Sequence, residues 1–141
     1  MVDREIIKSK LVFLEQTLVK LEELQSLKSK EFFKSFQNVD SAKYNLQVAI
    51  EAVIDIATHV VARERWGVPA SSAEAIRFLA ENNVITRDQS VRLMQMVKFR
   101  NRIVHIYQEV DDNQVYEILH QDLGDFRDFI RSVITKFLNE K

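Results

Sequence analysis

A nine-residue segment near position 100 concentrates side chains that could act on a phosphate ester. From Phe99 to Tyr107 the sequence reads Phe-Arg-Asn-Arg-Ile-Val-His-Ile-Tyr, which places two guanidinium groups, an amide, an imidazole and a phenol close together. A guanidinium carries a fixed positive charge, and an imidazole titrates near neutral pH. These groups suit a reaction in which negative charge develops on a phosphate while a proton is transferred.

The spacing of these side chains predicts a common face if the segment is helical. Each residue of a helix advances by about 100°. With Arg100 at zero, Asn101 lies at about 100° and His105 at about 140°. Tyr107 lies at about −20°, so the four side chains share an arc about 160° wide, whereas Arg102 lies outside it at about 200°. We therefore expect one face that carries a cation, a titratable group and a phenol.

Capping residues and apolar spacing predict the helices that must position this segment. Ser71 and Thr86 are each followed three residues later by Glu or Gln, a capping-box pattern that begins a helix. Apolar residues keep helical spacing through Gly124, so we expect the last helix to continue across that glycine. The predicted helices cover about residues 3–24, 40–65, 71–81, 86–110 and 113–139. Phe32, Phe33 and Phe36 are expected to anchor either a short helix or the start of the next one.

Length and composition predict a single all-α domain over residues 1–141. The chain has 141 residues, enough for one domain with a sizeable core, and only two glycines and one proline. No segment alternates convincingly at period two. We therefore predict an up-and-down bundle of about five helices with the helix of residues 40–65 at its centre. No apolar run predicts a membrane span, and the N-terminus lacks a signal-peptide core.

Charge and cysteine content exclude several classes of function. The absence of cysteine excludes disulfides and cysteine-based metal sites or nucleophiles, which fits a cytoplasmic protein. A formal net charge of −1 excludes nucleic-acid binding through a generally basic surface. Any such binding must use a local patch, and four cations of the predicted motif helix could supply it: Arg92, Lys98, Arg100 and Arg102.

A second polar group lies on the predicted central helix. Glu51, Asp55 and His59 are spaced at i, i+4 and i+8 and form one stripe. A divalent ion is conceivable there, but a single helix supplies all the ligands, so we expect no metal. We expect the stripe to pair with cations, those of the motif segment being candidates. Asp55 could orient a motif residue from behind.

The motif resembles the Arg-x4-His-x-Tyr signature of HEPN domains, specifically the HepT-like branch (the DUF86 group). Arg100-Asn101, Val104-His105 and Tyr107 carry the match. The resemblance extends from Tyr44 to Leu119, because residues 47–57 resemble the family's long second helix and residues 67–69 its following turn. An Arg-x4-His pattern alone recurs by chance, whereas the longer motif behind a matching upstream helix is far more specific.

The resemblance implies a fold and an activity. HepT-like proteins are, by family, metal-independent endoribonuclease toxins without a cofactor, usually two-fold dimers whose motif helices meet across a cleft. It implies that His105 is a general acid or base for attack by the RNA 2′-hydroxyl, that Arg100 stabilises the charge on phosphate, and that Asn101 positions His105 or substrate. The family's antitoxin partner is a minimal nucleotidyltransferase that transfers AMP to the motif tyrosine, here Tyr107.

Each motif residue also has a plainer interpretation. Arg100 could be a solvated helix arginine, His105 a packed histidine, and Tyr107 an aromatic residue at the protein boundary. Two other functions therefore stay open. The chain could be a non-catalytic partner that regulates, or presents substrate to, a nucleotidyltransferase. It could also be a structural helical dimer in which the motif side chains form a buried interface network.

Overall fold

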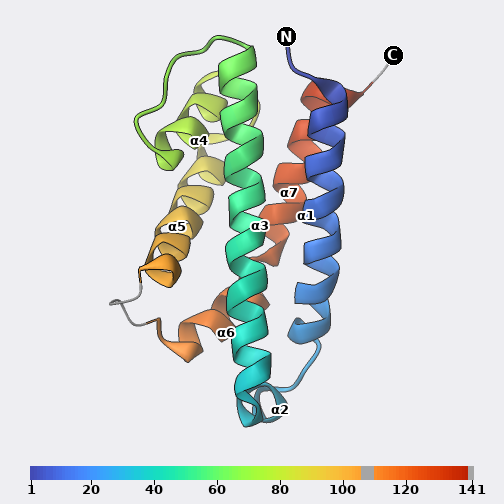
Figure 1. Cartoon of the computed structure of the whole chain (residues 1–141), viewed down its shortest axis with the longest axis vertical. Helices are drawn as coiled ribbons and strands as arrows, with labels where there is room; N and C mark the ends of the chain where they lie inside the picture. The colour runs from blue at the N-terminus through green and yellow to red at the C-terminus, as the bar shows by residue number, and fades with distance from the viewer. Residues whose placement is uncertain (106–109, 140–141) are drawn as a thin grey trace.

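Helix α3 is the centre of an all-α bundle. The computed structural model describes residues 1–105 and 110–139. In this part of the chain α3 contacts every other α-helix, with α1 on one side and α4 and α5 on the other (Figure 1). The described helices are α1 Arg4–Gln25, α2 Ser29–Lys34, α3 Phe36–Arg63, α4 Ser72–Glu81, α5 Arg87–Val104, α6 Asp112–Gln121, α7 Leu123–Val133 and a π-helical turn η1 Ile134–Leu138.

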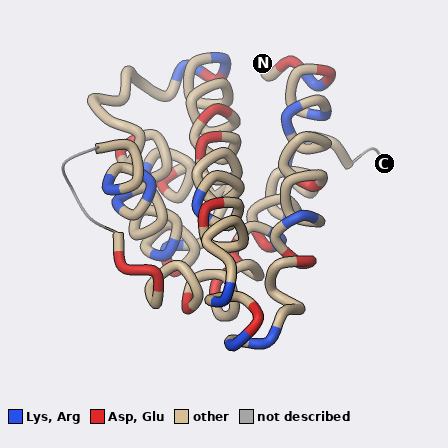
Figure 2. The backbone as a smooth tube through the Cα atoms, turned by 60° about the horizontal axis from the view of Figure 1, so that its bottom comes forward, with Lys and Arg blue, Asp and Glu red and all other residues tan. Residues whose placement is uncertain are grey.

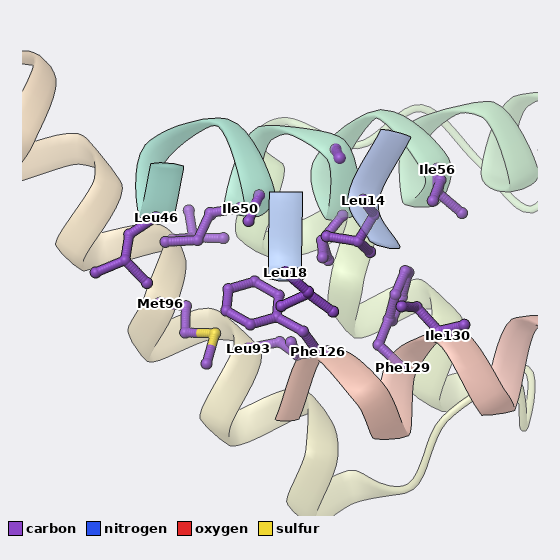
Figure 3. Packing of buried hydrophobic residues seen from close by; sticks show 14 of the residues in the cluster. Leu14, Leu18, Leu46, Ile50, Ile56, Leu93, Met96, Phe126, Phe129 and Ile130 are labelled. Carbon is purple, nitrogen blue, oxygen red and sulfur yellow. The ribbon is translucent and has the colours of Figure 1, made fainter. Parts of the chain in front are cut away.

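The core brings together apolar faces of four helices. Figure 3 shows buried apolar side chains meeting between α1, α3, α5 and α7, and each labelled side chain is at most 5% exposed. Burying such a side chain contributes about 1.5–3 kcal/mol, so this layer holds α5 firmly against α3 and α7. The labelled residues are Leu14, Leu18, Leu46, Ile50, Ile56, Leu93, Met96, Phe126, Phe129 and Ile130.

The all-α prediction is confirmed, and the described residues contain no strand. They form seven α-helices rather than about five, for two reasons. Of the three phenylalanines expected in a short helix or at the start of the next one, Phe32 and Phe33 lie in a separate short helix, α2. Phe36 is the first residue of α3, which begins there because the hydroxyl of Ser35 accepts a hydrogen bond from the Gln37 backbone at 3.2 Å. The expected last helix is divided into α6 and α7.

The division lies at Asp122, so the prediction of one unbroken helix over residues 113–139 is wrong. Asp122 has φ −114° and ψ 0°, and its carbonyl accepts a hydrogen bond from Asp125 at 3.0 Å. Leu119 and Leu123 on either side are both buried, so the apolar spacing persists through the bend and could not reveal it. Gly124 is not the cause, because a side chain there would meet open space.

The start of α5 follows the prediction closely. Both hydrogen bonds of a capping box are present, since Thr86 Oγ1 accepts from the Gln89 backbone at 3.1 Å and Gln89 Oε1 accepts from the Thr86 backbone at 2.7 Å. These bonds satisfy two otherwise free donors at the helix end. They fix where the helix carrying the motif begins.

Helix α3 is also long and apolar enough, by length and composition, to pass as a membrane span, which the sequence analysis did not anticipate. More than half of its most apolar stretch is buried within the bundle. Contacts with α1, α4, α5, α6 and α7 account for this composition.

Candidate functional site

The motif occupies the last turn of α5 and the residue that follows it. Helix α5 ends at Val104, and His105 follows in extended conformation, with φ −86° and ψ 107°. The helix predicted to reach residue 110 is therefore too long, and the angular position expected for His105 does not apply. Ile103 and Val104 are β-branched and lose side-chain freedom in a helix, which favours an end here.

Among the described motif residues, Arg100 is the most enclosed. Its side chain is 20% exposed and faces α3, where Nη1 lies 3.7 Å from Oε2 of Glu51. The expected pairing of the acidic stripe with a cation of the motif is thus confirmed for Glu51. The Nε of Arg100 is buried and has no acceptor among the described residues. A buried donor without an acceptor costs about 1–3 kcal/mol.

Asn101 and His105 are exposed at the same end of α5. The His105 backbone donates to the Asn101 carbonyl at 3.2 Å, which closes the last turn. Figure 2 shows Lys and Arg gathered on the final turns of α5, with acidic residues at the start of α6. Arg100, Asn101 and His105 thus lie in the last turn of α5 and at the residue after it, and their action as one site stays a prediction. Tyr107 lies outside the described residues, and its place beside them stays a prediction.

The residues of the polar stripe on α3 have different neighbours along the helix. Asp55 is exposed and lines, with Glu51, a cavity of about 320 Å³ between α1 and α3. Its orienting role stays a prediction. His59 faces the start of α1, where Nε2 accepts a hydrogen bond from the Asp3 backbone at 3.3 Å. Burial, and secondarily Arg63, lowers the pKa of His59.

The described residues do not form a metal-binding site. Three or more His, Cys, Asp or Glu side chains gather nowhere among the described residues in a way that could hold an ion. Glu51 contacts Arg100 and His59 contacts the N-terminal segment, so two members of the stripe serve different neighbours. The stripe is therefore a set of local contacts between helices.

The four cations expected to form one patch lie on different faces of α5. Arg92, Lys98 and Arg102 line a groove of about 530 Å³ between α5 and the α6–α7 pair, whereas Arg100 faces α3. The prediction of a single cationic patch is therefore wrong in its composition. A helix that packs on both α3 and α7 separates side chains on its opposite faces.

The groove also contains residues that the sequence analysis missed. Gln95 and Phe99 on α5 and Gln114 on α6 line it, and the carboxylates of Asp122 and Asp125 close its other side. Burial, and secondarily the charge of Asp125, raises the pKa of Asp122. The spacing of the α5 residues at positions 92, 95, 99 and 102 would have indicated one helix face. Only the bend before α7 supplies the opposite wall.

Comparison with known proteins identifies the family of this chain. A family model described as Ribonuclease HepT-like matches residues 14–133. The mRNA nuclease HepT of Shewanella oneidensis is 41% identical over 100 residues, which cover 71% of this chain and 75% of that protein. The tRNA nuclease HepT of Aphanizomenon flos-aquae is 24% identical over 128 residues, which cover 91% of this chain and 87% of that protein.

Solved structures are similar over nearly the whole chain. A tri-AMPylated HEPN toxin of Shewanella oneidensis, in complex with an MNT antitoxin, superposes with a TM-score of 0.88 at 34% identity. The match covers 96% of this chain and all of that one. With a family model that spans most of the sequence and these relatives beside it, the chain belongs to the HepT-like family of HEPN proteins.

Proposed function

We propose that this chain is a metal-independent endoribonuclease, the toxin of a HEPN and minimal-nucleotidyltransferase pair. The observation that carries the proposal is the group of Arg100, Asn101 and His105 at one end of α5, with a buried Arg100 donor that lacks an acceptor among the described residues. The relatives named as mRNA and tRNA nucleases support the reaction class. The similar toxin in complex with an MNT antitoxin supports the biological role.

The proposed reaction uses a nucleophile that RNA itself provides. His105 removes the proton of a 2′-hydroxyl, whose oxygen attacks the adjacent phosphorus. The bond from phosphorus to the 5′-oxygen breaks, and the departing oxygen takes up a proton from the protonated imidazole or from water. The products carry a 2′,3′-cyclic phosphate and a 5′-hydroxyl. An intramolecular nucleophile needs only a base and charge stabilisation, so the reaction can proceed without a metal ion. DNA lacks the 2′-hydroxyl and is not a substrate.

Arg100 and Asn101 have complementary roles in this scheme. The guanidinium of Arg100 stabilises the charge that develops on the phosphate oxygens, and its contact with Glu51 limits the positions it can adopt. The exposed amide of Asn101 lies one turn before His105 and can hold either the imidazole or the substrate. Asp55 remains a candidate for orienting the site from α3.

Cleavage of a mixed-sequence RNA by purified protein tests the proposal. His105→Ala should lower the rate by about 10²–10⁴-fold, the usual contribution of a general acid or base. His120→Ala is the matched control, because His120 lies on α6 and stacks on Tyr116 with ring centroids 4.0 Å apart. The same sequence as DNA should stay intact, and a chelator should not slow the reaction. Equal cleavage by wild type and His105→Ala would remove the catalytic assignment.

We further propose that the chain acts as a two-fold homodimer. One motif helix offers a single wall to an RNA strand, whereas a self-complementary pair doubles the motif around one groove. Exposed apolar side chains on α1 support an interface between copies, because Ile6 and Phe13, and likewise Val12 and Val19, recur at seven residues and each pair therefore shares a face.

Control by the antitoxin is proposed at Tyr107. The tyrosine hydroxyl would attack the α-phosphorus of ATP and release pyrophosphate, leaving AMP on the chain. The added negative charge would compete with substrate phosphate for Arg100. Co-expression with a minimal nucleotidyltransferase should therefore add AMP to the chain by mass spectrometry and suppress RNA cleavage. Tyr107→Phe should stay unmodified, and full modification of that variant would place the acceptor elsewhere.

A non-catalytic role as the partner or substrate-binding subunit of a nucleotidyltransferase is the alternative. It predicts that the pure chain cleaves no RNA under any condition, while the nucleotidyltransferase changes activity when the chain is added. The proposed nuclease would work in the cytoplasm, where its RNA substrates are.

A further inference from the structure

The groove between α5 and the α6–α7 pair is separate from the motif face. Its floor is a stripe of α5 residues, including Arg92, Phe99 and Arg102, and its far wall includes Gln114 and Ile118 of α6. At about 1.5 Å rise per residue, the stripe from position 92 to position 102 is about 15 Å long. The volume of about 530 Å³ lies within the usual range of ligand sites.

The positive charge of this groove is unevenly neutralised. Nε of Arg92 donates to Oδ1 of Asp125 at 2.9 Å, so these two charges offset each other. Among the described residues no carboxylate forms an ion pair with Lys98 or Arg102, which lie nearest the motif. Asp122 is the remaining acidic group of the lining. The end of the groove beside the motif is therefore its most cationic part.

Arg102 has a geometry suited to a nucleotide. Its guanidinium carbon lies over the ring of the buried Phe99, 5.8 Å from the centroid, within the range of a cation–π interaction. A guanidinium plane can also stack on a nucleobase. Its Nε is a buried donor without an acceptor among the described residues. The terminal Nη groups of Arg102, rather than this enclosed Nε, are the donors that can form charge-assisted hydrogen bonds with a phosphate oxygen.

We propose that this groove binds a single strand of RNA, with phosphates at Lys98 and Arg102 and a nucleobase against the Arg102 guanidinium. The inference rests on the proposed nuclease function and adds a positioning site on the face of α5 opposite Arg100. Gln95 and Gln114 supply amide groups that can hydrogen-bond to base edges. A strand lying in the groove runs along α5 toward the helix end where His105 lies, so the groove places the scissile phosphate near the motif.

Binding is measured on the full chain carrying His105→Ala, so that the probe stays intact. The probe is a short fluorescent single-stranded RNA, followed by anisotropy over a range of salt concentrations. Adding the pair Lys98→Gln and Arg102→Gln should weaken binding by about tenfold or more at low salt. Each lost phosphate contact should reduce the slope of log affinity against log salt by about 0.7. The control pair, Lys20→Gln and Arg87→Gln, removes the same charges from exposed positions outside the groove.

Two further variants separate charge, stacking and folding. Arg102→Lys keeps the charge and loses the planar group. Its RNA binding should therefore show the salt dependence of the chain with Arg102, but only part of the affinity. Lys98→Gln alone alters an exposed side chain, so its effect does not depend on whether the double variant folds. Thermal melting of each variant checks that the bundle is intact.

The outcomes for the groove and for the nuclease are distinguishable. Groove and control pairs that bind RNA equally, or a chain that binds no RNA, would overturn the proposed groove. A chain that binds RNA through the groove and cleaves none would overturn the nuclease and leave the groove. If both hold, the groove pair in the active chain should raise KM with kcat nearly unchanged, because it removes binding common to substrate and transition state.

Discussion

The two sides of α5 hold arginines of equal charge in different surroundings. Arg100 and Arg102 are two positions apart and about 160° apart around the helix. Arg100 lies against Glu51 of α3, which restricts its guanidinium and partly neutralises it. Arg102 lies over Phe99 at the edge of a groove and has no carboxylate partner among the described residues. The comparison teaches that the neighbouring helix decides whether a cation of the motif segment is held in place or left to attract substrate.

Between the two sides of α5, the largest expected effect comes from removing Arg100. If Arg100 stabilises the transition state, Arg100→Gln should lower kcat by about 10²–10³-fold, as loss of a transition-state donor does. Glu51 acts only through Arg100, and a surface ion pair contributes about 0.2–1 kcal/mol. Glu51→Gln should therefore lower kcat by at most about fivefold. Steady-state cleavage of a defined RNA measures both values.

The contrast between these variants separates a catalytic arginine from a structural one. Equal losses in Arg100→Gln and Glu51→Gln would mean that Arg100 only joins α5 to α3. Arg100→Lys is the conservative control, since it keeps the charge without the planar fork and should recover part of kcat. A melting temperature that drops in parallel with activity would also favour the structural account.

The side of α5 that faces α3 was largely predictable from sequence, and the groove side was not. The capping box at Thr86 and the apolar spacing locate the helix, and the i, i+4 stripe on α3 places Glu51 opposite a cation. Both signals depend on residues close in sequence or on one helix. The end of α5 differs from the prediction, because the helix ends at Val104 and does not continue through the motif. Angular spacing has no meaning beyond that residue.

The missed bend explains the missed groove. Gln114 and Ile118 come before Asp122, and Asp125 comes after it, yet all four line the same hollow. An unbroken helix could not surround the α5 face in this way. Sequence reasoning failed here because buried residues on both sides of the bend keep their helical period. Tertiary packing, rather than local propensity, decided the direction of α6.

The smallest expected effect concerns the acidic wall of the groove. Asp122 makes no side-chain capping bond at the start of α7, and burial together with Asp125 raises its pKa. A raised pKa means that the folded state holds the proton more tightly than the unfolded chain does. The charged carboxylate therefore lowers stability near neutral pH, and this loss disappears as the pH falls through the folded-state pKa. Asp122→Asn keeps the shape and removes the titration.

Asp122→Asn should melt slightly above wild type at about pH 7, and the difference should shrink as the pH falls through the raised folded-state pKa of Asp122, where the wild-type side chain becomes neutral. It should also bind single-stranded RNA more tightly at neutral pH, because one negative charge leaves the groove that holds Lys98 and Arg102. Asp128→Asn, on the same helix and outside the groove, is the control. Tighter RNA binding in both variants would reflect net charge alone, whereas an increase confined to Asp122→Asn would assign the effect to the groove. If Asp122→Asn leaves RNA binding unchanged and only the melting temperature moves, the carboxylate faces the fold and not a bound strand.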